Sequence, residues 1–340
     1  MRPRDPDLAQ AEEVARTLTG MPADIEHLLG GGRNSRIYHV RCGTGEFALK
    51  QYPLRTDDPR DRLSTEVDAL KLMERYSVDT VPRVVGFDRK RGFALLSWID
   101  GSAVTDIGDA DIDAATAFLA AIHALRNTPW ANEQPLAAEA CLSGVEIERQ
   151  VTERVTRLQR VPEERDLLCF LEKSFAPAFT REVANAKLKI QAAGLDFAGE
   201  LPQECRSLVP SDFGFHNSLR RSDGSLAFVD FEYFGWDDPV KLTADILLHP
   251  GRILAPPQRK RLRQGAVRLY GEDAAFARRL SAYIPLFGLR WVLILLNEFI
   301  PERWHRRVLA GDARSWNDAK ARQLADAQAF LASLSQKVED

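Results

Sequence analysis

Three polar residues in the second half of the chain have the types and the spacing that phosphoryl transfer requires. Asp212 is followed five positions later by Asn217, and Asp230 ends an apolar run over residues 226–229. A carboxylate can accept the proton of an attacking hydroxyl group, and amide and carboxylate oxygens are ligands that Mg²⁺ prefers. We therefore predict that Asp212 is a catalytic base and that Asn217 and Asp230 bind Mg²⁺. Glu232 could add a second carboxylate near the ion or cap the next turn.

Lys50 and Glu66 precede this segment in an order that favours a joint role. Lys50 follows an apolar run in a predicted strand, and Glu66 lies on the predicted helix that comes next. A lysine at such a position can contact the α- and β-phosphates of a nucleotide if a carboxylate holds it. In isolation the two residues would be solvated surface charges, but their order before Asp212 favours a functional ion pair that anchors phosphates.

A glycine-rich stretch over residues 30–35 separates two predicted strands. Because glycine has no side chain, backbone N–H groups in such a stretch can fold over phosphate oxygens. The nucleotide-binding residues predicted here are Gly31, Gly32, Asn34 and Ser35. No Lys-Ser or Lys-Thr pair and no helix follows the glycines, so the stretch is not a Walker loop, and a plain hairpin turn is the alternative.

The residues before position 100 must form a small sheet. Strand-like alternation occurs over residues 25–29, 37–40, 47–52, 81–87 and 92–99, and a helical pattern lies over residues 59–76. This order predicts a five-stranded antiparallel sheet with one helix. We expect residues 1–99 to form an N-terminal nucleotide-binding lobe.

The rest of the chain has mainly helical periodicity. Short strands are expected only beside the Asp212 segment, and prolines at 162 and 177 are expected to interrupt the helices of residues 149–193. We expect residues 100–340 to form a larger catalytic and substrate-binding lobe. The predicted fold class is therefore α+β, with two lobes.

These residues and their order resemble the aminoglycoside phosphotransferase and choline kinase-like family, which has a protein-kinase-like fold. The family pattern is His-Gly-Asp-x4-Asn, then Ile-Asp-Phe-Glu, then Gly-Asp-Pro-x-x-Asp-Leu-Ala. The chain has Pro210-Ser211-Asp212 with Asn217, then Val229-Asp230-Phe231-Glu232, then Asp237-Asp238-Pro239, within a resemblance that covers about residues 25–300. The resemblance implies ATP between two lobes, with adenine against a linker around Ser97-Trp98-Ile99, in which Ser97 and Ile99 are the predicted binding residues. It also implies Mg²⁺ and transfer of the γ-phosphoryl group to a hydroxyl of a small molecule.

Two departures from the family pattern concern loop geometry more than chemistry. Pro210 and Ser211 replace His-Gly, which removes the histidine that usually braces the catalytic loop, and His216 is expected only to shape that loop. Leu242 stands where the family's later Asp would fall, although Asp245 is close by. The first departure motivates an alternative, a nucleotide-binding pseudokinase with a regulatory or scaffold role. A protein kinase is disfavoured because Phe-Glu, not Phe-Gly, follows the metal-binding Asp and no Ala-Pro-Glu segment is present.

The composition and charge of the chain limit its location and partners. The 340 residues carry a net charge of −3, and the four cysteines are scattered without metal-ligand spacing, as expected of free thiols in a reducing cytosol. The N-terminus lacks an apolar signal segment. The longest apolar stretch, residues 284–300, contains Pro285, Arg290, Asn297 and Glu298, which favours a buried helix over a membrane span. We therefore expect a cytoplasmic protein with no membrane partner; the oligomeric state is not predicted.

A basic segment over residues 251–322 bears on the acceptor. It holds 15 Lys and Arg against 6 Asp and Glu. Aminoglycosides are polycations, so this segment favours an anionic or neutral acceptor, whereas a solvated helix surface is the alternative. No nucleic acid partner is expected, because aromatic residues do not interleave with the basic ones.

Overall fold

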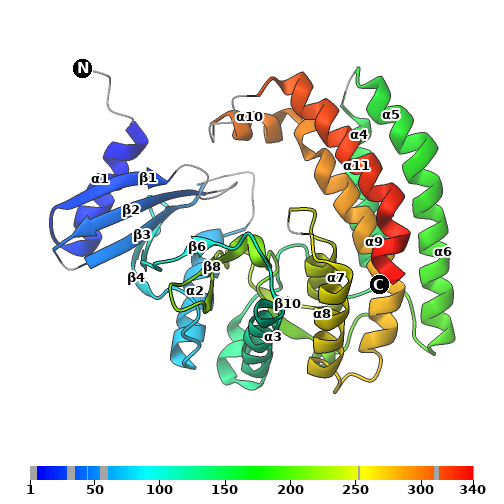
Figure 1. The fold of residues 1–340 in the computed structure, drawn as a ribbon, viewed down its shortest axis with the longest axis horizontal. Coiled ribbons are helices and arrows are strands. Elements are labelled where there is room, and N and C mark those ends of the chain that lie inside the picture. The colour runs from blue at the N-terminus through cyan, green and yellow to red at the C-terminus, as the bar shows by residue number, and fades with distance from the viewer. Residues whose placement is uncertain are drawn as a thin grey trace. The chain divides into compact units, whose positions relative to one another are not determined.

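A computed structural model describes residues 6–28, 35–43, 45–53, 60–161, 163–251, 253–309 and 314–339. The chain divides by its contacts into two compact units (Figure 1). The first, which we call the sheet unit, comprises Met1–Asp106, Ala124–Ala138 and Pro210–Gly235. The second, which we call the helical unit, comprises Ile107–His123, Glu139–Val209 and Trp236–Asp340. This grouping differs from lobes of residues 1–99 and 100–340, because the segment with Asp212, Asn217 and Asp230 belongs to the sheet unit. The two-lobe boundary stays a prediction.

The five-stranded antiparallel sheet is present and has the order β1-β2-β3-β5-β4. Its strands are β1 (Ala23–Leu28), β2 (Arg36–Cys42), β3 (Gly45–Gln51), β4 (Val84–Asp88) and β5 (Phe93–Ser97). Side chains alternate between the two faces of a strand, and residues directly opposite each other share a face. One face, which we call the lysine face, is therefore defined by the paired residues Ile37, Lys50, Ala94, His39, Ala48 and Leu96.

Helix α2 (Arg62–Arg75) is the helix predicted between the third and fourth strands. Its N-cap residue is Asp61, whose Oδ1 accepts a hydrogen bond from Ser64 N at 3.0 Å and satisfies one free N–H group of the first turn. The buried residues Glu66, Leu70 and Met73 follow helical spacing. Glu66 is therefore a charged residue on the buried face of α2.

Helix α1 (Pro6–Thr19) was not predicted and packs on the opposite face of the sheet (Figure 1). The fully buried side chains of Ala11, Val14 and Ala15 form one apolar cluster with residues of that face: Tyr38, Val40, Leu49, Phe93 and Leu95. These sheet residues alternate with those of the lysine face. Helix α1 thus removes from water the apolar face that the sheet would otherwise expose.

A second antiparallel sheet, of order β6-β8-β9, carries the segment predicted to be catalytic. Its strands are β6 (Ser102–Ala103), β8 (Ser218–Arg220) and β9 (Leu226–Phe228). Ser218 pairs with Phe228, and Val229 N donates to Asn217 O at 3.0 Å. The β8–β9 hairpin therefore places Asn217 beside the residues that lead into Asp230. A Cβ on Gly101, just before β6, would lie 2.9 Å from Arg220 O, so this entry into the sheet requires glycine.

The helical unit confirms the prediction that the later part of the chain is mainly helical. Its helices are α3 (Asp109–Ala124, whose last residue belongs to the sheet unit), α4 (Gly144–Gln159), α5 (Arg165–Phe170), α6 (Ala176–Ala192), α7 (Pro239–Leu248), α8 (Pro256–Leu269), α9 (Phe276–Leu295), α10 (Pro301–Leu309) and α11 (Trp316–Glu339). Two short strands, β7 (Ser207–Val209) and β10 (Gly235–Asp237), pair with each other.

The expected break at Pro177 is wrong. A π-helical turn over Leu171–Phe175 joins α5 directly to α6, and Pro177 lies in the first turn of α6. The wider turn avoids the clash between the proline ring and the preceding carbonyl groups, so the helix continues. Pro162 lies outside the described residues.

The predicted buried helix at residues 284–300 corresponds to the second half of α9 and the 3₁₀ turn Leu296–Phe299 that follows it. The stretch Phe276–Phe299 has a mean hydropathy of 1.5 and is the one candidate span among the described residues, but 72% of its most apolar window is buried within the chain. Gly288 lets α11 approach closely, because a Cβ there would lie 2.2 Å from Leu334 Cδ1. Such burial is that of a core helix.

Candidate active site

Lys50 on β3 lies among three carboxylates, with 4% of its side chain exposed. Its Nζ donates to Glu66 Oε2 at 2.5 Å and to Asp230 Oδ1 at 2.6 Å, and it lies 3.6 Å from Glu232 Oε2. Burial lowers the pKa of Lys50, but the charges of Asp230 and Glu66 together outweigh it and hold that pKa well above its usual value. Lys50 is therefore a fixed cation. The predicted ion pair with Glu66 is formed, and its role on phosphates stays a prediction.

Glu66 is held in place by two further donors. Tyr52 OH donates to Glu66 Oε2 at 2.7 Å, and Phe231 N donates to Glu66 Oε1 at 3.2 Å. Tyr52 was not among the predicted site residues, although it follows Lys50 by two positions, the spacing that places strand residues on one face. The contact with Phe231 N links α2 to the residue after Asp230.

Glu232 does not cap a turn, which was one of its two predicted roles. Its Oε1 accepts a hydrogen bond from Arg62 NH1 at 2.9 Å, and the Arg62 guanidinium lies 5.2 Å from the ring centroid of Tyr233. Burial and the charge of Asp230 raise the pKa of Glu232, whereas Lys50 and Arg62 lower it. The net result is a pKa above the usual value of a glutamate. Arg62 was also missed, although it lies one helical turn before Glu66.

Asp230 is the acidic residue in this cluster that solvent reaches most easily. Carboxylate oxygens of Glu66, Asp230 and Glu232 lie within 4.8 Å of one another, which makes them a candidate cation site among the described residues. All three pair with Lys50 or Arg62, but the side chains of Glu66 and Glu232 are 1% exposed, whereas that of Asp230 is 29% exposed. Asp230 has a φ of 73°, a left-handed conformation rare outside glycine.

Asn217 has an amide orientation that suits a metal ligand. Its Nδ2 donates to the backbone oxygen of Asp212 at 2.9 Å. Because that bond uses the nitrogen, Oδ1 points away from the Asp212 carbonyl and can serve as a hard oxygen ligand. Together with Asp230 across the hairpin, it gives the donor set that Mg²⁺ favours.

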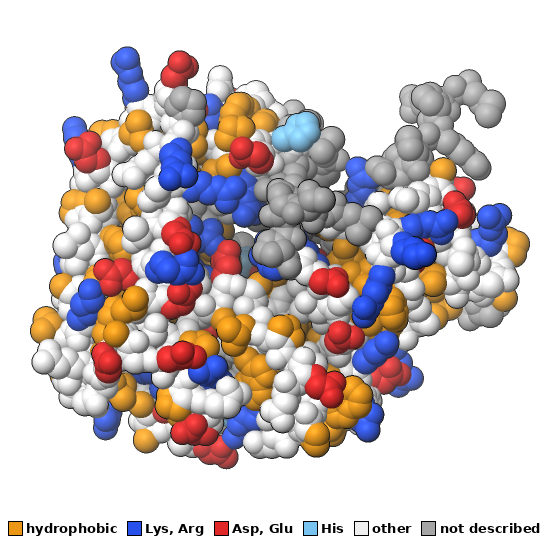
Figure 2. Space-filling model, turned by 180° about the vertical axis from the view of Figure 1, so that it is seen from behind, with side chains coloured by type: hydrophobic (Ala, Val, Ile, Leu, Met, Phe, Trp, Pro, Cys, Tyr) orange, Lys and Arg blue, Asp and Glu red, His pale blue; other side chains and the backbone are white. Residues whose placement is uncertain are grey.

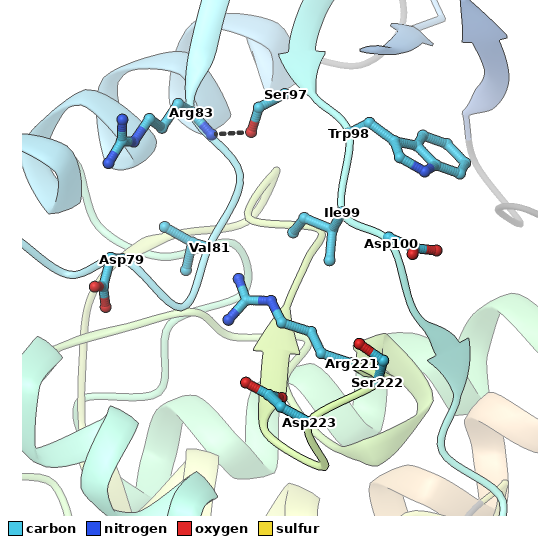
Figure 3. Close-up of a pocket in the computed structure, with 10 residues that line it drawn as sticks. All are labelled: Asp79, Val81, Arg83, Ser97, Trp98, Ile99, Asp100, Arg221, Ser222 and Asp223. Atoms are coloured by element: carbon cyan, nitrogen blue, oxygen red, sulfur yellow. Dashed lines mark hydrogen bonds between the residues drawn. The ribbon is translucent and has the colours of Figure 1, made fainter. Parts of the chain in front are cut away.

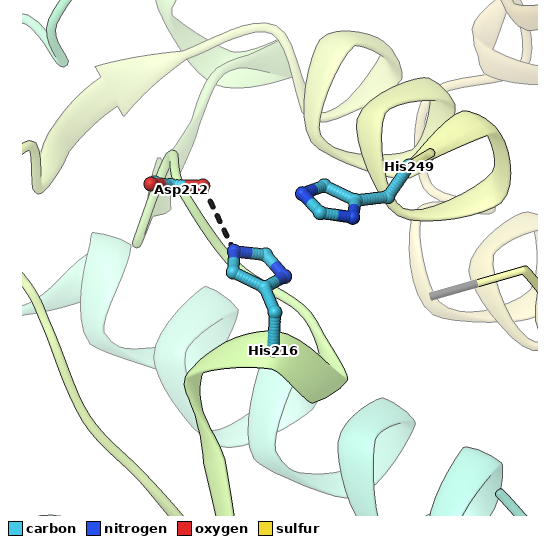
Figure 4. Close-up of side chains that lie close together, drawn as sticks. All are labelled: Asp212, His216 and His249. Atoms are coloured by element: carbon cyan, nitrogen blue, oxygen red, sulfur yellow. Dashed lines mark hydrogen bonds and ion pairs between the residues drawn. The ribbon is translucent and has the colours of Figure 1, made fainter. Parts of the chain in front are cut away.

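Asp212 lies in a tight loop, and 43% of its side chain is exposed. Ser211 before it has a φ of 67°, and Phe213 N donates to Ser211 O at 3.0 Å, so the chain turns sharply at this point. His216 Nε2 lies 3.0 Å from Asp212 Oδ1, as the dashed line in Figure 4 shows. The histidine expected to precede Asp212 is absent from the sequence, but a histidine four residues later contacts its carboxylate. This contact between His216 and Asp212 was not predicted.

The linker after β5 borders a pocket of about 490 Å³ in the sheet unit. Ser97 Oγ accepts a hydrogen bond from Arg83 N at 2.9 Å, whereas the side chains of Ile99 and Arg221 point toward the pocket (Figure 3). Neither Lys50 nor a carboxylate that contacts it lines this pocket. The Ser97 hydroxyl therefore braces the linker, and binding of adenine by Ser97 and Ile99 stays a prediction.

Trp98 is the linker side chain that reaches the lysine face. Its ring stacks on that of His39, with centroids 3.8 Å apart and planes 10° from parallel. Trp98 also lines the pocket, and in Figure 3 its ring and the side chain of Ile99 point in different directions from the linker. Of the glycine-rich stretch, Gly31, Gly32 and Asn34 lie outside the described residues, while Ser35 is half-buried directly before β2.

The second departure from the family pattern is explained within the helical unit. Leu242 is buried, and Asp245, one turn later on α7, accepts hydrogen bonds from Arg290 NH2 at 2.6 and 2.8 Å and from Trp291 Nε1 at 2.9 Å. Asp238 caps α7 through Val240 N at 2.9 Å. Asp245 therefore joins α7 to α9, and Asp238, which also accepts hydrogen bonds from Arg279, joins the start of α7 to the same helix.

About half of the basic side chains of residues 251–322 form ion pairs within the helical unit. Seven of these side chains form ion pairs with carboxylates: Arg261, Arg279, Arg290, Arg307, Arg314, Lys320 and Arg322. Several partners, such as Asp113 and Glu164, lie outside the segment. Basic and acidic side chains are also mixed over the face drawn in Figure 2. The excess positive charge is therefore weak support for an anionic acceptor.

Comparison with known proteins relates the whole arrangement to one family. The model of the phosphotransferase enzyme family, APH, matches residues 26–280. A search of curated proteins found no match.

Solved structures share the fold at low sequence identity. An ethanolamine kinase from Plasmodium vivax has a TM-score of 0.60 and 11% identity, over 92% of this chain and 84% of that one. A choline kinase from Streptococcus pneumoniae has a TM-score of 0.58 and 15% identity, over 95% and 99% of the two chains. A thermostable mutant of an aminoglycoside phosphotransferase, in complex with ADP and hygromycin B, has a TM-score of 0.56 and 14% identity, over 95% and 98%. The protein-kinase-like fold is thereby confirmed.

Proposed function

Because the chain belongs to the phosphotransferase enzyme family, we propose that it transfers the γ-phosphoryl group of ATP to a hydroxyl group of a small molecule. The observation that carries this proposal is the cluster of ion pairs that Lys50 forms with Glu66 and Asp230 in the sheet unit. The sheet unit also contains Asp212 and Asn217. The ADP bound to the similar aminoglycoside phosphotransferase supports the choice of a nucleotide donor.

Lys50 would bind the phosphates of the nucleotide. Its charge is fixed by Glu66 and Asp230, and a cation held in place needs no reorganisation when negative charge shifts during transfer. Trp98, on the same face of the sheet, would offer an aromatic surface to the adenine ring.

Asp212 would orient the acceptor hydroxyl and take its proton. The oxygen of the acceptor forms a bond to the γ-phosphorus, the bond from that phosphorus to the bridging oxygen breaks, and ADP leaves. The displaced hydroxyl proton passes to the carboxylate of Asp212, whose Oδ1 lies 3.0 Å from His216 Nε2. The exposure of Asp212 leaves room for an acceptor beside this carboxylate.

Asn217 and Asp230 would hold Mg²⁺, and their oxygens fit that ion. Both are hard ligands, they flank one hairpin, and Asp230 is open to solvent. When bound, the ion would neutralise the charge of the nucleotide phosphates. Glu66 and Glu232 are engaged by Lys50 and Arg62 and would serve as supports for the site.

The candidate acceptors include cationic as well as anionic hydroxyl compounds. The similar structures are named for ethanolamine, choline and aminoglycoside substrates, all of which carry amino or ammonium groups. Ion pairing offsets part of the positive charge of residues 251–322 and so weakens the electrostatic reason to disfavour such compounds. We also propose a cytoplasmic location, where ATP and reduced cysteines would both be expected.

The test is an ADP-release screen with Mg-ATP across cationic, neutral and anionic hydroxyl compounds. The matched control is Asp212→Asn, which keeps the shape of the side chain but cannot accept the proton. We expect at least one acceptor to stimulate ADP release in the natural protein and a fall of about 10²- to 10⁴-fold in the variant. Equal stimulated rates in both proteins would remove Asp212 from the reaction. Nucleotide binding without turnover of any acceptor would favour the pseudokinase alternative.

A further inference from the structure

We propose that His216 is a positioning residue that orients the carboxylate of Asp212 for the reaction. Its Nε2 lies 3.0 Å from Oδ1 of Asp212 (Figure 4). An ionised carboxylate has no proton to donate, so the histidine must donate from Nε2. This inference rests on the proposed role of Asp212 as the base.

The reason that Asp212 needs such support is its exposure. With 43% of the side chain exposed, the carboxylate could rotate about Cβ–Cγ and present either oxygen to solvent. A hydrogen bond on Oδ1 selects one orientation and directs Oδ2 toward the acceptor. Fixing a reacting group in this way lowers the barrier because less freedom is lost at the transition state.

The backbone at Gly214 leaves space for the imidazole ring. A Cβ at that position would lie 3.1 Å from His216 Nδ1 and 3.2 Å from Cε1. The carbonyl of Gly214 accepts hydrogen bonds from Asn217 N and from Ser218 Oγ, both at 3.0 Å. The ring of His216 therefore lies close against a hydrogen-bonded loop, where an extra methyl group at Gly214 would have to displace the ring by a few tenths of an ångström.

His216 and Asn217 hold Asp212 at two points. Asn217 Nδ2 donates to the backbone oxygen of Asp212 at 2.9 Å, while His216 contacts the side chain. Asn217 thus fixes the main chain, and His216 fixes the carboxylate. This pair supplies the bracing that the chain lacks at Pro210 and Ser211.

The inference is tested with three substitutions of His216 in the full-length protein, assayed with an acceptor found in the screen. Alanine removes the donor. Glutamine can place an amide nitrogen near the position of Nε2, whereas the shorter asparagine cannot. We expect kcat to fall roughly 10- to 100-fold in His216→Ala and His216→Asn, with KM for ATP unchanged within about twofold, and to recover largely in His216→Gln. A purely structural role predicts no selective recovery with glutamine.

Double variants separate this inference from the proposed function. If His216 acts through Asp212, adding His216→Ala to Asp212→Asn will cause no further loss of kcat. Full activity of His216→Ala beside an inactive Asp212→Asn would overturn only the role of His216, as would an equal loss in His216→Gln and His216→Ala. Full activity of Asp212→Asn would overturn the proposed function itself. Thermal melting and Mg-ADP binding of each variant check that the fold and the nucleotide site persist.

Discussion

Replacing Glu66 with glutamine should destabilise the sheet unit strongly, although the two side chains have nearly the same shape. Glu66 is 1% exposed and accepts hydrogen bonds from Lys50, Tyr52 and Phe231. Glutamine has a single acceptor oxygen. Whichever way its amide is turned, the NH₂ group must face a donor, either Lys50 and Tyr52 or the backbone N–H of Phe231.

The magnitude follows from these contacts. A buried donor left without an acceptor costs about 1–3 kcal/mol, and removal of one partner of a buried ion pair costs about 3–5 kcal/mol. The two costs overlap, and Asp230 still pairs with Lys50 in the variant. We therefore expect a loss of about 3 kcal/mol in the free energy of unfolding. Tyr52→Phe is the matched control, because it removes one hydrogen bond to the same oxygen and should cost about 1–2 kcal/mol.

The assay is equilibrium unfolding in urea at pH 7, followed by far-UV circular dichroism and by tryptophan fluorescence. Two probes are needed because the chain has two compact units, which need not unfold together. A loss below about 1 kcal/mol in Glu66→Gln, or a loss no larger than that of Tyr52→Phe, would refute the view that Glu66 holds a buried charge in place.

Three further outcomes follow from single contacts. Gly214→Ala should lower kcat as His216→Ala does, because its Cβ would lie 3.1 Å from the His216 ring. Steady-state kinetics measures this loss, the affinity for Mg-ADP should be unchanged, and a normal kcat would contradict the prediction. Burial raises the pKa of Glu139, but Arg154, Arg290 and Lys241 lower it to a net value of about 2. A carboxylate with a lowered pKa stabilises the fold at pH values above its ordinary pKa near 4.5. The difference in free energy of unfolding between the natural protein and Glu139→Gln should therefore shrink as pH falls toward 2. Urea titrations from pH 6 to pH 3 that show a constant difference would count against this prediction. Gly288→Ala should cost about 1–3 kcal/mol by forcing Leu334 aside, and Leu334→Ala in the same chain should relieve that clash; calorimetry that finds Gly288→Ala neutral would refute the close contact between α9 and α11.

The strands and helix predicted from the spacing of apolar residues before position 100 are present in the structure. Alternation along residues 36–51 and helical spacing from Glu66 to Met73 bring Lys50 and Glu66 together, because each rule fixes which face a side chain takes. The same rules could have found Tyr52 and Arg62, which share faces with residues already chosen. The proximity of Asn217 to the residues that lead into Asp230 is predictable because their hairpin is local in sequence, and their role as metal ligands stays a prediction.

Features that depend on contacts distant in sequence or on the geometry of a loop were missed. Helix α1 is marked only by small apolar residues such as Ala11 and Ala15, whose value lies in the sheet face that they cover. Counting charges over residues 251–322 cannot find the pairs Arg261–Asp113 and Lys320–Glu164, which join residues distant in sequence. The anionic or neutral acceptor stays a prediction. The contact between His216 and Asp212 depends on loop geometry at Gly214, which no periodicity predicts.

The most direct test of the proposed reaction measures the phosphorylated product itself. The natural protein and Asp212→Asn would be incubated with Mg-ATP and the best acceptor from the screen, and the acceptor analysed by mass spectrometry and ³¹P NMR. The proposal predicts one phosphoryl group on a hydroxyl oxygen of the acceptor with equimolar ADP, and almost none with Asp212→Asn. Phosphorylated product at equal rates with both proteins, or ADP formed without any phosphorylated acceptor, would contradict it.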